Sequence, residues 1–306
     1  MTINKTKGLI AAPFTGMNSS GGVNLKNITE YAAHLKKMGV SGVFVAGTTG
    51  EGLLLNDKER MEVIEAWISQ KRDNFRVIAH VGSTSLSSAK ELAAISARAG
   101  ADAIGCMGPP FCGPNRVNEL VAFNNDVALS ASELPFYYYH IPVLSRVDFS
   151  MSEFLNQAKN IIPNLAGIKF TDNNLMDMSK CLSMDNGKWD ILHGYDELLL
   201  AGLSFGAKGA VGSTYNFLAP LYYGLIEDFE RGNIAEAREK QRKSIEFIDI
   251  LNRYNGALVS GKAIMALLGI DCGPCRKPLR NLTVQEIRKL KLELYDWGFF
   301  EMVESY

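Results

Sequence analysis

The sequence lacks a charge excess and a long apolar run. Its 306 residues include 32 Lys and Arg against 33 Asp and Glu, so the formal net charge is −1. Such a chain has no electrostatic attraction to nucleic acid or to an anionic membrane surface. No apolar run approaches the ~18 residues of a membrane helix, and Met1–Lys5 lacks the apolar stretch of a signal peptide. The five cysteines fit reduced thiols. We therefore expect a cytoplasmic protein with neither a nucleic-acid nor a membrane partner.

Signatures of several catalytic classes are also missing. The four histidines, His34, His80, His140 and His193, include no His-x-His or His-Glu-x-x-His pair, which disfavours a metal-dependent hydrolase or aldolase. No Gly-x-Ser-x-Gly elbow is present. The pair Cys272 and Cys275 has the spacing of a redox motif but not its strand-then-helix context, so a structural role is favoured. We expect no metal.

What the sequence does contain is a repeating pattern of short apolar runs separated by helical patterns. Hydrophobic residues make up 47% of the chain, which suits a packed globular core. The runs read as short buried strands, and strands that alternate with helices indicate right-handed crossovers and a parallel sheet. Eight such runs fit a closed (β/α)8 barrel better than an open sheet. They cover Gly8–Ala12, Gly42–Ala46, Arg76–His80, Ala103–Cys106, Phe136–Tyr139, Gly167–Phe170, Asp190–His193 and Gly209–Gly212.

The C-terminal part has a different pattern. From about Leu218 onward no strand pattern remains, and helices are expected near Ile234–Tyr254, Ser260–Leu268 and Thr283–Trp297. The fold class is therefore α/β, a (β/α)8 TIM barrel with a C-terminal helical extension. We place the catalytic barrel at residues 1–225 and the extension, packed on the barrel, at residues 226–306.

Lys169 is the most informative single residue. It lies in Leu165–Phe170, an otherwise apolar strand, close to the carboxyl end where barrel active sites lie. A lysine that points into a barrel loses water, which favours the neutral amine. A neutral amine can attack a carbonyl carbon and form a Schiff base. The alternative is a strand-end lysine that extends to solvent.

Other polar residues follow neighbouring strands. Thr48 and Thr49 lie in Gly47-Thr48-Thr49-Gly50-Glu51, where two hydroxyls and backbone N–H groups suit a carboxylate or phosphate; a plain strand-to-helix turn is the alternative. This loop lacks the lysine of a P-loop, which disfavours nucleotide binding. Tyr139 ends the fifth strand, where a phenol can move a proton. Because side chains alternate along a strand, Tyr137 lies on the same face of the strand as Tyr139, and Tyr138 lies on the opposite face.

Taken together, the motifs resemble the N-acetylneuraminate lyase and dihydrodipicolinate synthase superfamily of Schiff-base barrels, and within it the N-acetylneuraminate lyase (sialic acid aldolase) branch. The resemblance runs from about Gly8 to Pro278. Each motif is short, but the order of the motifs along the chain and their placement at strand ends are specific to this superfamily. The motifs are Ala12-Pro13-Phe14-Thr15, Gly47 to Glu51, Glu59-Arg60, His80-Val81-Gly82, Tyr139-His140-Ile141-Pro142, Gly167-Ile168-Lys169, Gly194-Tyr195-Asp196-Glu197 and Gly212-Ser213-Thr214-Tyr215-Asn216.

The resemblance implies reversible cleavage of N-acetylneuraminate to N-acetylmannosamine and pyruvate. Lys169 would form the imine and Tyr139 would relay a proton. Thr48 and Thr49 would hold the carboxylate. Because the protonated imine accepts the electrons, no metal or cofactor is expected. The resemblance also implies a homotetramer that acts on small molecules. The sugar hydroxyls would be bound by Thr171, Gly194, Asp196, Glu197 and Ser213.

Three alternatives remain open. One is another pyruvate-dependent Schiff-base enzyme, such as a dihydrodipicolinate synthase or a keto-sugar-acid aldolase. The synthases carry an arginine two residues after the proline of the Tyr139 motif, where this chain has Leu144. Another is a non-catalytic barrel that binds keto acids, which intact Lys169 and Tyr139 disfavour. The third alternative gives Asp196 and Glu197 a structural role in place of sugar binding. Asp196 would then cap the following helix, and the negative charge of Glu197 would interact with the positive end of the helix dipole.

Overall fold

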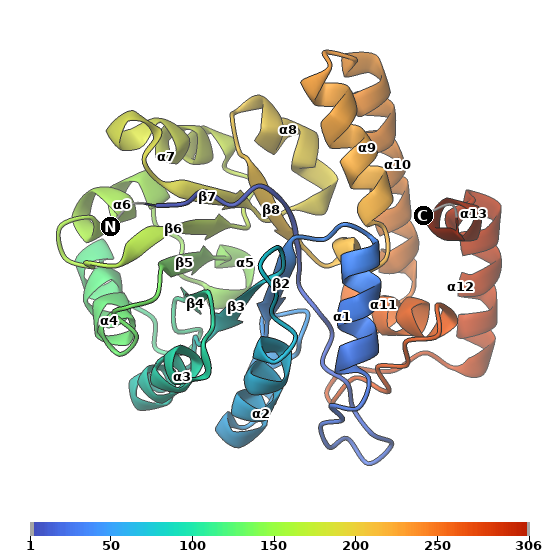
Figure 1. Ribbon diagram of the computed structural model, residues 1–306, viewed down its shortest axis with the longest axis horizontal. Helices are drawn as coiled ribbons and strands as arrows, with labels where there is room; N and C mark the ends of the chain where they lie inside the picture. The colour runs from blue at the N-terminus through green and yellow to red at the C-terminus, as the bar shows by residue number, and fades with distance from the viewer. Residues whose placement is uncertain (1–2, 305–306) are drawn as a thin grey trace.

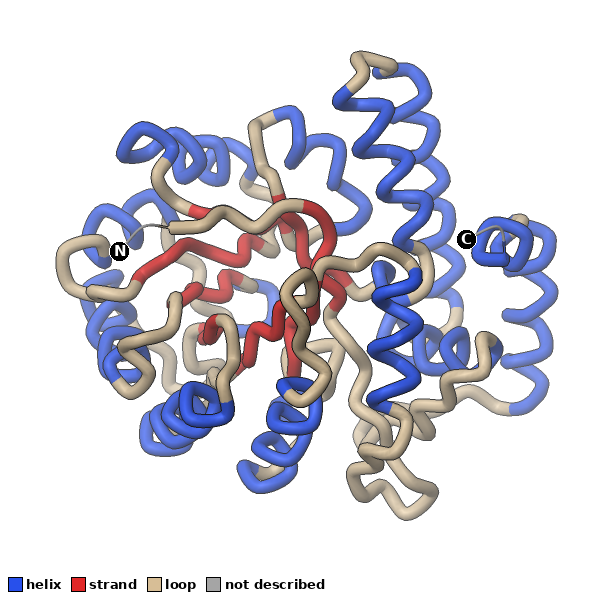
Figure 2. Tube along the Cα trace, in the orientation of Figure 1, coloured by secondary structure: helices blue, strands red, loops and turns tan. Residues whose placement is uncertain are grey.

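Eight parallel strands form a closed barrel in the order β1 to β8 (Figure 1). The computed structural model describes residues 3–304. Figure 2 shows the strands gathered at the centre, with helices around them. The predicted (β/α)8 barrel is confirmed, and three of the eight predicted strands have the observed bounds. The strands are β1 Gly8–Ala11, β2 Gly42–Val45, β3 Arg76–His80, β4 Ala103–Met107, β5 Phe136–His140, β6 Leu165–Phe170, β7 Asp190–His193 and β8 Gly209–Gly212.

The helices between the strands begin and end at residues whose chemistry explains the boundaries. Asn56 and Glu59 form a reciprocal capping box at the start of α2. Gly100 takes a left-handed φ of 90° after α3 and turns the chain toward β4. The helices are α1 Ile28–Lys37, α2 Asp57–Ile68, α3 Leu86–Ala99, α4 Val117–Leu129, α5 Pro142–Ser145, α6 Met151–Ala158, α7 Leu175–Gly187 and α8 Leu199–Ser204, with 3-10 turns η1 Gly52–Leu54, η2 Asp196–Leu198 and η3 Thr214–Asn216.

Strand alternation divides the core into two apolar layers. Tyr137 and Tyr139 lie with Ile10, Phe44 and Val211 in the layer inside the barrel. Tyr138 belongs to the larger layer between the strands and the surrounding helices. The predicted split between the faces of β5 is therefore confirmed, and it directs Tyr139 toward the barrel axis.

The C-terminal helices pack beside the barrel (Figure 1). The ring of Phe247 on α10 lies 5.0 Å from that of Trp297 and 5.5 Å from that of Phe299, which joins α10 to the last helices. The predicted helical extension is confirmed. The boundary that we predict between residues 225 and 226 falls inside α9. The helices are α9 Ala219–Glu230, α10 Ile234–Arg253, α11 Gly256–Leu267, α12 Val284–Trp297 and α13 Phe299–Glu304. Within residues 3–304, no helix has the length and apolar character needed to cross a membrane.

Candidate active site

A cavity of about 330 Å³ opens at the carboxyl ends of the strands. Parallel strands of a barrel end at the same face, so the loops after β2, β5, β6, β7 and β8 converge there. All nine residues predicted from the sequence line this one cavity: Thr48, Thr49, Tyr139, Lys169, Thr171, Gly194, Asp196, Glu197 and Ser213.

The Lys169 amine lies inside the barrel and does not extend to solvent. Residues 139 and 169 are paired in register on β5 and β6, so their side chains leave the sheet on the same face. Lys169 is 5% exposed. Its Nζ atom lies 3.6 Å from the ring centroid of Tyr139 and 4.7 Å from that of Phe44. The amine is thus held between two aromatic rings at the wall of the cavity.

The Tyr139 hydroxyl faces the loop after β2. It lies 3.3 Å from Thr48 Oγ1, within hydrogen-bonding distance. The Tyr139 ring is buried and packs edge-on against Phe44 and His80. These contacts fix the phenol between the Lys169 amine and the Thr48 hydroxyl, where it can pass a proton along a short polar path.

Gly194 and Thr171 form one side of the cavity. The Thr171 Oγ1 atom is buried and has no hydrogen-bond partner within residues 3–304. A Cβ atom at position 194 would lie 2.0 Å from Thr171 Oγ1 and 2.8 Å from the carbonyl oxygen of Phe170. Any side chain at position 194 would therefore collide with the Thr171 hydroxyl, and glycine allows this hydroxyl to lie at the cavity wall.

Asp196 and Glu197 lie at the mouth, but their environments differ. Asp196 is buried, and its Oδ2 accepts hydrogen bonds from the backbone N–H (2.9 Å) and the hydroxyl (2.6 Å) of Thr214. No side-chain cap forms at the start of η2, so the capping alternative for Asp196 is wrong. Burial raises the pKa of Asp196 and also that of the half-buried Glu197. Asp196 thus joins the loops after β7 and β8.

The cavity also contains residues that the sequence reasoning missed. Tyr195 and Thr214 follow β7 and β8. Ile248 and Asn252 come from α10, and Ala257 and Leu258 come from α11. The helical patterns predict those two helices but not which face meets the barrel mouth. No sequence signal identifies Asn252, because its place depends on how the extension docks.

Comparisons with known proteins place the chain in a family. A family model described as the dihydrodipicolinate synthetase family matches residues 5–295. The chain belongs to this family. An N-acetylneuraminate lyase of Xenopus laevis is 44% identical over 278 residues, which cover 90% of this chain and 91% of the relative.

Solved structures of other members agree closely with this fold. The N-acetylneuraminate lyase of Proteus mirabilis superposes with a TM-score of 0.93 at 40% identity, covering 97% of this chain and 100% of the other. The Aliivibrio salmonicida enzyme, described as a sialic acid aldolase, gives 0.94 at 37% identity, covering 97% and 98%. The resemblance to N-acetylneuraminate lyases that the motifs indicate is thereby confirmed.

The chemistry available in this member of the family comes from its side chains. Across residues 3–304, no group of three or more His, Cys, Asp or Glu residues is arranged to hold a metal ion. The cavity instead combines one buried amine, a phenol close to a threonine hydroxyl, and carboxylates that accept hydrogen bonds. This set suits covalent chemistry on a carbonyl compound that carries several hydroxyls.

Proposed function

We propose that the chain is a Schiff-base aldolase that reversibly cleaves N-acetylneuraminate to N-acetylmannosamine and pyruvate. The observation that carries the proposal is the buried Lys169 amine, which lies 3.6 Å from the Tyr139 ring in the cavity that also collects the predicted sugar-binding residues. The names of the relatives support the same substrate.

The reaction starts at the keto carbon of the open-chain sugar. The neutral Lys169 amine attacks this carbon, and loss of water, with a proton supplied by the Tyr139 phenol, gives a protonated imine and leaves Tyr139 as the phenolate. The Tyr139 phenolate takes the proton of the C4 hydroxyl, the C3–C4 bond breaks, and its electron pair moves into the imine to form an enamine. The aldehyde that leaves is N-acetylmannosamine. Protonation of the enamine at C3 and hydrolysis of the imine then release pyruvate and regenerate the amine.

The remaining predicted residues bind the two ends of the substrate. Thr48 and Thr49 hold the carboxylate beside the imine. Thr171, whose hydroxyl has no hydrogen-bond partner within residues 3–304, and Ser213 bind sugar hydroxyls, and Gly194 leaves room for the Thr171 hydroxyl. Glu197, and Asp196 through the oxygen not used by Thr214, accept hydrogen bonds from the polyol.

A two-part experiment tests the proposal against its rivals. Incubation with pyruvate and borohydride, followed by mass spectrometry, should add one reduced pyruvate to Lys169. Incubation with N-acetylneuraminate should release pyruvate in a coupled assay. A non-catalytic keto-acid binder would give neither turnover nor an adduct. Another Schiff-base aldolase or synthase would trap pyruvate but would not cleave N-acetylneuraminate; Leu144, in place of the arginine of the synthases, supports the lyase.

We also propose a homotetramer. Large apolar side chains are exposed on the segments that follow β2, β4 and β5, which include η1 and α5, and Phe111 is 74% exposed. Exposed apolar side chains on segments that end at the same face of a barrel favour a protein–protein contact at that face. Light scattering at working concentration should give four subunits, and a monomer would contradict this part of the proposal. The exposed residues are Leu53, Leu54, Phe111, Val143 and Leu144.

The cellular setting that fits this activity is the cytoplasm, with small molecules as the only substrates. The five cysteines are all free thiols, which supports a reducing compartment. The division into a barrel, residues 1–225, and an extension, residues 226–306, belongs to the same proposal. The extension completes the cavity, since Ile248 and Asn252 on α10 line it, so the barrel alone should not bind the whole substrate.

A further inference from the structure

A buried ion pair joins the C-terminal extension to the loop that carries Thr48 and Thr49. Lys262 on α11 lies 2.6 Å from Glu51 Oε1, and the side chains are 3% and 0% exposed, respectively. Lys262 also donates a hydrogen bond to the carbonyl oxygen of Pro274 at 3.0 Å. Neither residue lines the site cavity next to Lys169. Two charges withdrawn from water in this way are stable only while they remain paired.

The segment after α11 adds further links to the same loop. The backbone N–H of Arg276 donates to Glu51 Oε2 at 2.7 Å, so both carboxylate oxygens of Glu51 contact the extension. The Arg276 guanidinium binds the Glu59 carboxylate on α2 and the carbonyl oxygen of Leu54. The end of the loop, at Glu51, and the turn that follows it, at Leu54, are therefore attached to the C-terminal segment.

The backbone of this loop needs such attachment. Ala46 and Glu51 flank the two threonines, and both have left-handed φ values, 55° and 56°, which cost free energy in residues other than glycine. A Cβ atom at Gly52 would lie 1.8 Å from the carbonyl oxygen of Ala46, so the loop is folded tightly on itself. Strained conformations of this kind persist only where surrounding contacts fix them. For Glu51 those contacts are the hydrogen bond from its own N–H to the carbonyl oxygen of Thr48 at 3.0 Å and, at its side chain, Lys262 and the Arg276 backbone.

We propose that Glu51 and Lys262 are positioning residues for the carboxylate subsite of the keto acid. The inference rests on the proposed function, because it assigns the carboxylate to Thr48 and Thr49. The ion pair holds the Glu51 backbone in its left-handed conformation and thereby sets the place of the two hydroxyls relative to Lys169. Without it the hydroxyls move away from the carboxylate, while the Lys169 amine, on a different strand, keeps its place.

The expected consequence is a change in KM more than in kcat. The threonine hydroxyls bind the carboxylate equally well in the bound substrate and in the transition state. Weaker hydrogen bonds to the carboxylate therefore raise KM and leave kcat largely unaltered. Loss of one hydrogen bond to a charged group corresponds to a rise of about 10-fold to 150-fold.

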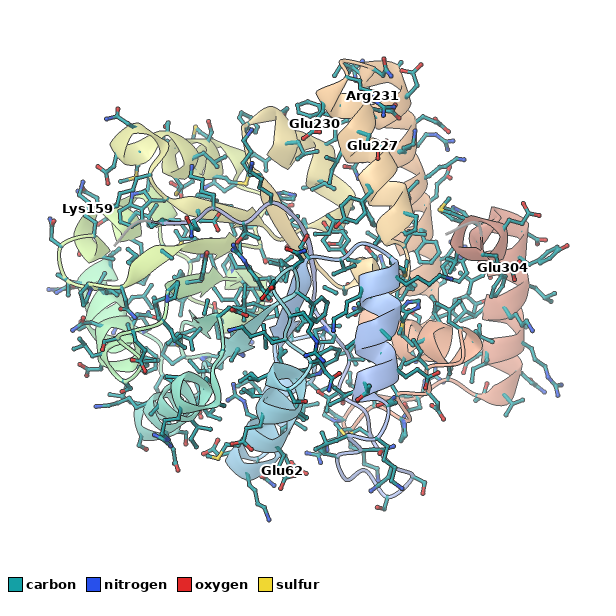
Figure 3. The ribbon with its side chains drawn as sticks, in the orientation of Figure 1. Glu62, Lys159, Glu227, Glu230, Arg231 and Glu304 are labelled. Atoms are coloured by element: carbon teal, nitrogen blue, oxygen red, sulfur yellow. The ribbon has the colours of Figure 1, made fainter. Side chains whose placement is uncertain are left out.

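The test is Lys262→Met, which keeps the length of the side chain and removes its charge. The KM for pyruvate in the condensation direction and the pyruvate concentration that gives half-maximal borohydride trapping are measured together with the melting temperature. Lys159→Met is the matched control, since Lys159 pairs with Asp185 at 3.1 Å. Lys159, labelled in Figure 3, lies on the opposite side of the molecule from α11, labelled in Figure 1 in the same orientation. We expect both pyruvate constants to rise in Lys262→Met and to stay within about 2-fold in the control.

A double variant separates positioning from stability. Glu51→Gln with Lys262→Met leaves no uncompensated charge, so its melting temperature should recover toward that of the wild type, while its KM for pyruvate stays raised. If KM recovers together with the melting temperature, or if neither variant shifts KM beyond the control, the positioning role is wrong. Should Lys262→Met fail to fold, Glu51→Gln alone carries the same comparison. Failure of the proposed function is distinct, because the wild type itself would then fail to cleave N-acetylneuraminate, whatever the variants do.

Discussion

Asp196 and Glu197 are adjacent in the sequence, yet their replacement should have different effects. Asp196→Asn removes a charge that accepts two hydrogen bonds from Thr214 in a buried position. Glu197→Gln removes a charge that receives no hydrogen bond from another residue within residues 3–304 and that faces the cavity. The first change damages the joint between two loops as well as the site, whereas the second affects only the site.

The magnitudes follow from hydrogen bonds to charged groups. Asparagine retains one acceptor for Thr214, so Asp196→Asn should cost about 1–2 kcal/mol of unfolding free energy, which in a chain of this size lowers the melting temperature by about 2–6 °C. Glu197→Gln should leave the melting temperature within about 1 °C. A lost hydrogen bond between a carboxylate and a sugar hydroxyl is worth about 1.5–3 kcal/mol, which raises KM for N-acetylneuraminate about 10-fold to 150-fold.

Three measurements on the same preparations check this reasoning: thermal melting, KM for N-acetylneuraminate and borohydride trapping of pyruvate. Trapping should be normal in both variants, because pyruvate has no polyol. An unchanged KM in Glu197→Gln would remove the carboxylate from the proposed sugar site. A normal melting temperature in Asp196→Asn would show that the two contacts with Thr214 contribute little to the fold.

Three further predictions concern the amine, the phenol and a buried ring. Lys169→Ala should lower turnover by about 10³-fold or more and abolish the pyruvate adduct, since Lys169 supplies the one side-chain amine that residues 3–304 place at the cavity; an adduct on the variant would assign the imine to another lysine. Tyr139→Phe should slow turnover by about 10²–10⁴-fold while the imine is still trapped, and normal turnover would exclude a proton relay. Burial, with Arg60 beside the ring, lowers the pKa of His80 to about 3. The unfolded chain therefore takes up a proton below pH ~6.5 while the folded chain does not, and unfolding free energy falls as the pH drops from there toward 3. His80→Gln should flatten this slope in urea titrations between pH 7 and pH 4, and an unaltered slope would assign it to other groups.

The barrel could be predicted from the sequence because its signals are local. A buried strand such as Arg76–His80 needs a short apolar run, and a helix end such as Ala99-Gly100 needs a residue that accepts a left-handed φ. Eight strand–helix units favour a closed parallel barrel over an open sheet. In such a barrel the carboxyl ends of all strands lie at one face. Lys169 and Tyr139 could therefore be assigned to one site before any distance was known.

Contacts between distant segments needed the tertiary structure. The sequence places Glu51 in a loop motif and Lys262 in a helix, but nothing local pairs them, and the same holds for Asp196 with Thr214. Asn252 reaches the cavity only because α10 docks against the barrel. Periodicity determines which residues of a strand or helix share a face, whereas the free energy of packing between elements decides which faces meet. The sequence alone therefore determined the barrel and the amine at its centre, and the packing of the extension decided how the mouth of the site is closed and held.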